Sequence, residues 1–167
     1  MKRIPEDGAL SQRCNSSMQL TRAADYAVRV MVQLATLPDE GRAFLPDLAR
    51  FTDAPESFLS KVLQGLTHAK LISSRRGKAG GFAILPAGRL ATMRQVIEAI
   101  DGPICLNVCL NGDKDCERKS WCPAHPVWAR AQRAMLDVLM SVTVSAMAAS
   151  AGARSKSAFP IASPPTD

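Results

Sequence analysis

The chain has 167 residues, of which 47% are apolar and 22% charged, an ordinary composition for a globular protein. This length is enough for one hydrophobic core with an appended segment, and it excludes collagen-like, coiled-coil-only and fully disordered chains. We find neither a secretory signal nor a bilayer-spanning run of about 20 apolar residues, so we expect a cytoplasmic protein with no membrane association. The net charge of +6 favours a polyanionic partner, without distinguishing DNA from a membrane surface.

Periodic apolar sequence begins only after residue 17, and we expect 1–17 to be a disordered extension. Apolar residues spaced by three and four after Thr21 predict an amphipathic helix, capped by Thr21 and ending before Pro38. A short helix follows near 46–51. Asp53 and Glu56 have capping-box spacing and predict a third helix that runs to Ala69. Its buried stripe is expected to be Phe58, Leu59, Val62, Leu63 and Leu66.

Two short segments, 71–76 and 82–85, flank a glycine-rich turn and predict the two strands of a β-hairpin. Thr92 and Gln95 then predict the cap of a fourth helix that ends near Ile100. The order of helix, short helix, helix and hairpin is typical of a winged helix-turn-helix, here over 18–103. We therefore expect a mainly α fold with a small hairpin, whose third helix lies in the major groove of double-stranded DNA.

The charge distribution supports the same interpretation. Between Ser57 and Ile97 there are seven basic residues and no acidic residue, as neutralisation of phosphates requires. The exposed face of the third helix and the arginines of the wing are the candidate DNA contacts. These candidates are Ser57, Ser60, Lys61 and Gln64 on the helix, and Arg75, Arg76 and Lys78 on the wing.

Four cysteines, Cys105, Cys109, Cys116 and Cys122, fall within the loop 104–125. In a chain without an export signal, this clustering indicates first a metal or cluster site and second a redox switch. The spacing does not match the paired knuckles of a zinc ribbon, and the longer intervals favour an iron–sulfur cluster. His125, three residues after Cys122, is a candidate fourth ligand. A structural zinc site and a cluster-free thiol switch remain open alternatives.

After this loop, apolar residues repeat at intervals of three and four and predict one long helix over 126–149. Its narrow seam is expected to pack against a second copy of the chain, giving a homodimer. The seam consists of Trp128, Ala131, Met135, Val138 and Val142. Residues 150–167 are expected to form a disordered tail.

The sequence contains no nucleophile–base pair and no glycine-rich phosphate loop entering a helix, so we expect neither an enzyme nor a small-molecule substrate. An iron–sulfur electron-transfer protein is an alternative, but it leaves the recognition helix and the wing without a role.

The opening Met18–Thr21 with Asp25–Ala27, and the wing sequence Leu71–Gly81, resemble the Rrf2 family of bacterial repressors, whose members include IscR and NsrR. The resemblance extends from about Met18 to Ala149. It implies that Arg76 enters the minor groove. It also implies that the recognition region includes Ser57, Phe58, Ser60 and Lys61. Ser60 stands where IscR has a glutamate, which implies that a different operator is read.

The resemblance also implies a set of cluster ligands, Cys109, Cys116 and Cys122, for a 2Fe–2S or 4Fe–4S cluster. The gap between the first two is one residue longer than in IscR, so Cys105 is an alternative first ligand. The fourth ligand is either His125, as in IscR-like proteins, or Asp25 of the partner subunit, as in NsrR-like proteins. The expected signals are nitric oxide, oxygen, redox state, or iron and cluster supply.

Overall fold

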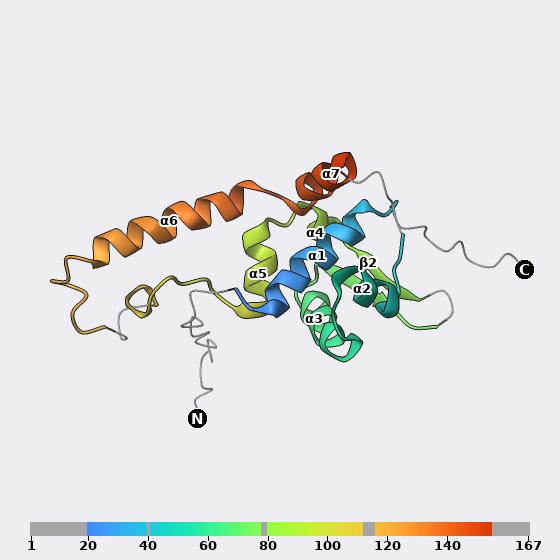
Figure 1. Ribbon diagram of the computed structural model, residues 1–167, viewed down its shortest axis with the longest axis horizontal. Coiled ribbons are helices and arrows are strands. Elements are labelled where there is room, and N and C mark those ends of the chain that lie inside the picture. The colour runs from blue at the N-terminus through green and yellow to red at the C-terminus, as the bar shows by residue number, and fades with distance from the viewer. Residues whose placement is uncertain (1–19, 40, 78–79, 112–115, 155–167) are drawn as a thin grey trace, which may run out of the picture.

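The computed structural model describes residues 20–39, 41–77, 80–111 and 116–154. It is a helical body with a small hairpin and one long helix that extends away from the body (Figure 1), which confirms the predicted fold class. The elements are α1 (Arg22–Thr36), α2 (Leu45–Thr52), α3 (Glu56–His68), β1 (Ile72–Arg75), β2 (Gly81–Ile84), α4 (Pro86–Leu90), α5 (Met93–Asp101), the 3₁₀ turn η1 (Val108–Leu110), α6 (His125–Ser141) and α7 (Val144–Arg154). In the described ranges, no helix is both long and apolar enough to cross a membrane. The expected extension 1–17 lies outside these ranges.

Helix α1 runs through the centre of the core and packs against α3, α5 and α7. Its buried side chains follow the predicted helical spacing: Ala24, Ala27, Val30, Met31 and Leu34. The hydroxyl of Thr21 accepts the N–H of Ala24, which confirms the predicted cap. The N–H and the hydroxyl of Thr21 also donate to the carboxylate of Asp101 at 3.2 and 2.6 Å. The start of α1 is thereby fastened to the end of α5.

The predicted start of α3 is wrong. Asp53 does not cap this helix but ends α2 in the left-handed conformation (φ 53°, ψ 44°), where its N–H donates to carbonyls of α2. Aspartate adopts this conformation more readily than most residues. Helix α3 begins after Pro55. Phe58, expected in the buried stripe, lies in the first turn and is 40% exposed, with its ring edge-on to Tyr26 at a centroid distance of 5.8 Å.

The wing is the antiparallel pair of β1 and β2, in which Ile72 lies opposite Ile84 and Arg75 opposite Gly81. Ala43 and Phe82 exchange two backbone hydrogen bonds of 3.0 and 2.9 Å, which join the wing to the segment before α2. Gly81 has a φ of +102°, and a Cβ there would lie 2.8 Å from the carbonyl oxygen of Ala43. Only glycine fits this close approach without strain.

Helix α4 is absent from the sequence prediction, although Pro86 in its first turn is a common helix-start signal. The helix presents Arg89 to the end of α1. The guanidinium donates to the carbonyls of Ala35 and Leu37 at 2.9 and 3.1 Å, and it pairs with Asp39 at 3.2 Å. Arg89 therefore closes the carboxyl end of α1.

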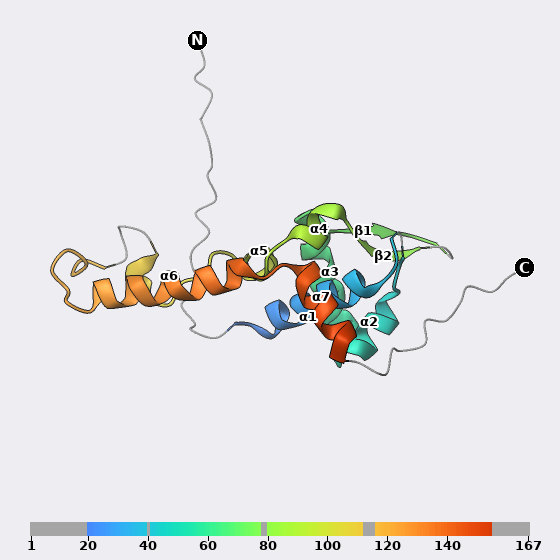
Figure 2. The same ribbon diagram turned by 90° about the horizontal axis from the view of Figure 1, so that it is seen from above.

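The single helix predicted over 126–149 is two helices, α6 and α7 (Figure 2). Val142 is extended, and its carbonyl accepts the N–H of Met93 at 3.0 Å, while the N–H of Val144 donates to Ala91 at 2.9 Å. Residues 142–144 are all β-branched, which disfavours a helix and suits this short extended pairing. Residues 150–154, expected in the tail, are helical; residues 155–167 lie outside the described ranges.

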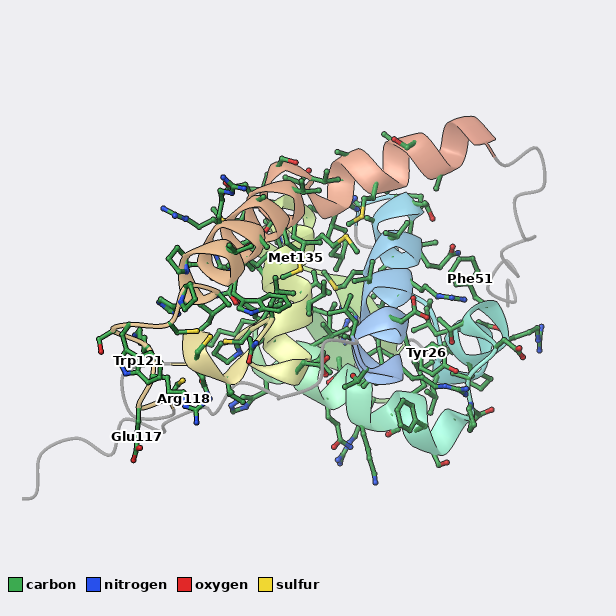
Figure 3. The ribbon with its side chains drawn as sticks, turned by 60° about the vertical axis from the view of Figure 1, so that its left-hand side comes forward. Tyr26, Phe51, Glu117, Arg118, Trp121 and Met135 are labelled. Carbon is green, nitrogen blue, oxygen red and sulfur yellow. The ribbon has the colours of Figure 1, made fainter. Side chains whose placement is uncertain are left out.

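The residues of the predicted α6 seam do not all face the same surroundings. Met135 is half-buried and lies between α6 and α5 (Figure 3). Ala131 and Val138 are exposed, and helical geometry places them on one stripe with Val127 and Ala134. Helix α6 thus has one side against its own chain and a separate apolar stripe toward solvent.

Candidate DNA-binding surface and thiol loop

Helix α3 carries the candidate recognition residues on the side opposite the core. Ser57, Lys61 and Gln64 are exposed and Ser60 is half-buried. Residues spaced by three and four lie on one face of a helix, so these side chains form a single polar stripe. The buried side of the same helix consists of Leu59, Val62, Leu63 and Leu66.

The wing presents two exposed arginines. Arg75, the last residue of β1, and Arg76 are both exposed. The turn that follows is tight: Gly77 has a φ of +99°, and a Cβ on Gly80 would lie 2.4 Å from the carbonyl oxygen of Arg75. Lys78, the third candidate of the wing, lies outside the described residues. The described part of the wing thus carries two exposed arginine side chains next to a tight turn that requires glycine.

The seven basic residues of the segment 57–97 do not all serve the same purpose. Arg89 closes α1, and Arg94 pairs with Glu98 at 3.1 Å within α5. The exposed basic residues that the structure describes in this segment are Lys61, Lys70, Arg75 and Arg76. The exposed positive charge of this segment therefore lies on α3, its end and the wing.

The thiols of the loop between α5 and α6 differ in exposure. Cys109 lies in η1 and is 8% exposed, while Cys116 and Cys122 are half-buried, and all three are free. Cys105 is disulfide-bonded. The disulfide separates Cys105 from the three free thiols that the family resemblance implies as ligands.

His125 begins α6, and its N–H donates to the carbonyl of Cys122 at 3.2 Å. Its side-chain Nδ1 is buried and has no hydrogen-bond partner among the described residues. His125 and Cys116 line the same open hollow, together with Glu117, Lys119 and Ser120. A buried ring nitrogen without a partner needs an explanation, and coordination of a metal is one that suits histidine.

The structure does not bring all the candidate ligands together. In the described ranges, no three residues among His, Cys, Asp and Glu lie close enough to hold a metal ion. Asp25 lies in the first turn of α1, pairs with Arg29 at 3.0 Å and is 51% exposed. The donor types suit an iron–sulfur cluster, and Cys116 and His125 line the same hollow.

Two contacts of the loop are missing from the sequence prediction. The side chains of Glu98 and Gln132 accept backbone N–H groups of Ile104 and Leu106. Neither residue belongs to a recognisable motif, and backbone partners leave no pattern in a single sequence. Arg118 also lies over the ring of Trp121, 5.9 Å from its centroid, and Trp121 is strongly exposed (Figure 3).

Comparison with known proteins identifies the family. The Rrf2 family, described as iron-dependent transcriptional regulators, matches residues 20–150. The chain belongs to the Rrf2 family. It is 28% identical to an rrf2-like helix-turn-helix regulator of Rhodobacter capsulatus, over 82% of this chain and 97% of the relative. It is 30% identical to the regulator NsrR of Bacillus licheniformis, over 76% of this chain and 90% of the relative.

Among solved structures, the cysteine regulator CymR of B. subtilis superimposes with a TM-score of 0.64 and 25% identity, covering 79% of this chain and 97% of CymR. The two sequence relatives are named as transcriptional regulators. The expected Rrf2 resemblance is therefore confirmed, and this Rrf2 protein is a helix-turn-helix transcriptional regulator.

Proposed function

We propose that this Rrf2 protein is a homodimeric repressor whose affinity for double-stranded operator DNA is controlled by an iron–sulfur cluster in the loop 104–125. The controlling signal is nitric oxide, oxygen, redox state, or iron and cluster supply. DNA binding is assigned to the polar stripe of α3 and the wing, and its control to the free thiols of the loop.

In the DNA complex, α3 lies in the major groove, where Ser57, Ser60, Lys61 and Gln64 contact base edges and phosphates. Arg75 and Arg76, with Lys78, contact the adjacent minor groove, whose narrow A·T-rich stretches attract arginine. What supports this assignment is that the exposed basic residues described in 57–97 lie on α3, its end and the wing. Two copies of the chain read the two halves of a near-palindromic operator.

The observation that carries the cluster part of the proposal is the unpaired, buried Nδ1 of His125 in the same hollow as Cys116. Cys109, Cys116 and Cys122 supply the thiolates. The orphaned nitrogen favours His125 as the fourth ligand over the exposed, ion-paired Asp25 of the partner subunit. When bound, a cluster with one non-thiolate ligand supplies an iron whose ligands exchange readily, as a sensor requires.

The homodimer is supported by the solvent-facing stripe of α6. None of the residues of α6, all of which are described, is buried. Val127 and Val138 on the stripe are 59% and 66% exposed. Apolar side chains gathered on one exposed helix face are typical of an interaction surface, and a second copy offers a self-complementary face about a two-fold axis.

A second candidate is a DNA-binding regulator without a cluster, controlled by thiol oxidation or by zinc. The observation that favours it is that three free thiols, Cys109, Cys116 and Cys122, lie in one loop. In this alternative the DNA-binding half of the proposal is unchanged.

Anaerobic purification followed by a visible absorption spectrum and iron and acid-labile sulfide analysis separates the two candidates. We expect a coloured protein with comparable iron and sulfide. Cys116→Ala should abolish the visible absorbance, because it removes a thiolate ligand. Ser120→Ala changes the same hollow without removing a ligand type and should keep the colour. A wild-type protein that stays colourless after reconstitution overturns the cluster and leaves the thiol or zinc regulator.

A further inference from the structure

The segment between α5 and η1 has no regular secondary structure, yet it is only partly accessible to water. Two of its backbone N–H groups are bound by side chains from the helices on either side. The N–H of Leu106 donates to Oε1 of Gln132 in α6 at 3.0 Å. The N–H of Ile104 donates to Oε1 of Glu98 in α5 at 3.4 Å. Backbone donors withdrawn from water require such partners, so these two side chains contribute to holding the segment in place beside α5 and α6.

The Glu98 carboxylate is itself held. Its Oε1 lies 3.1 Å from Nε of Arg94, one helical turn away. The Nη1 of Arg94 in turn donates to Sδ of Met140 in α6 at 3.2 Å. The segment, α5 and α6 are therefore joined by one set of polar contacts at the place where the two helices lie side by side (Figure 3).

Cys109 follows this anchored segment by three residues and is the most buried of the three free thiols. The turn η1 that carries it packs on α6. We infer that Gln132 and Glu98 are positioning residues, which hold 104–106 between α5 and α6 and thereby keep the Cys109 thiol buried at a fixed place. That Cys109 is a cluster ligand rests on the proposed function; that its burial depends on Gln132 and Glu98 does not.

The same contacts give the loop a mechanical connection to the DNA-binding module. Helix α5 is bonded to the start of α1 through Asp101 and Thr21, and its first turn pairs with the segment after α6. A displacement of the segment 104–106 would therefore shift its contacts with α5 and α6. These two helices contact the module that carries α3 and the wing, so the displacement would reach that module. Packed side chains and hydrogen-bond networks can carry energetic coupling between distant sites, and these residues form such a network.

The test uses the cluster-free full chain and measures how fast iodoacetamide alkylates Cys109, read by peptide mass spectrometry with Cys116 as the internal reference. Gln132→Met keeps the length and helix preference of the side chain but removes the acceptor. It should raise the rate at Cys109 about fivefold, the effect of one lost hydrogen bond, and leave Cys116 unchanged. Gln132→Glu keeps an acceptor oxygen and should match the wild type. Arg133→Met, on the exposed side of the same helix, should also match.

Equal rates at Cys109 in Gln132→Met and wild type overturn the inference, and so does an equal increase in Arg133→Met. This outcome is independent of cluster binding. After reconstitution, Gln132→Met should also show a smaller ratio of cluster-loaded to cluster-free operator affinity than Gln132→Glu. A wild-type chain that takes up no cluster contradicts the proposed function, while the alkylation rates still decide the positioning role.

Discussion

Arginines of the same basic segment differ in what they contact. The guanidinium of Arg89 donates hydrogen bonds to the carbonyls of Ala35 and Leu37, whereas Arg76 is exposed on the wing. A count of charges along the sequence treats the two residues alike. The distinction could not be predicted, because the partners of Arg89 are backbone carbonyls more than 50 residues away.

Replacing Arg76 of the wing should weaken DNA binding without affecting folding. We expect Arg76→Ala to lower operator affinity by roughly 1–3 kcal/mol and to reduce the slope of log affinity against log salt by about one. Its melting temperature should stay at the wild-type value, because the side chain is exposed. Fluorescence anisotropy over a salt series measures both quantities.

The matched control for this substitution is Arg130→Ala, which removes one exposed positive charge from α6, away from the wing. It should leave the salt slope nearly unchanged. Identical slopes for Arg76→Ala and wild type would remove the wing from the DNA interface.

Among the secondary-structure elements, those whose signals are local could be predicted. Thr21 caps α1, and Thr92 with Gln95 forms the predicted capping box of α5. Asp53 and Glu56 carry an equally good pattern, but the left-handed turn at Asp53 ends α2 instead. The break between α6 and α7 depends on pairing with Ala91 and Met93, contacts that lie far away in sequence.

The exposed stripe of α6 predicts the behaviour of a dimer-interface variant. Val138→Glu would bury an unpaired carboxylate between two subunits, which is strongly unfavourable. We expect the dissociation constant of the dimer to rise by about tenfold or more, measured by sedimentation equilibrium. Arg133→Glu places the same charge on another side of α6. A Val138→Glu protein that is as dimeric as Arg133→Glu would exclude the stripe as the interface.

At the scale of the whole molecule, the wing and the thiol loop lie at opposite ends (Figures 1 and 2). The order of α1, α2, α3, the wing and α5 could be predicted, because helical spacing and turn residues act on short stretches of sequence. The contacts that connect the thiol loop to the DNA-binding module could not be predicted. Helix α6 begins at the loop, and the segment after it pairs with 91–93 through Val142 and Val144. Helix α6 therefore connects the loop to the DNA-binding module.

The most direct test of cluster control is the operator affinity of cluster-loaded against cluster-free protein at one fixed ionic strength. The operator is first selected from random duplex DNA with the wild-type chain. Typical coupling between two sites changes affinity by about 5- to 150-fold, and we predict a difference of at least about fivefold. Equal affinities of the two forms for the selected operator would contradict the account, even if the protein binds a cluster.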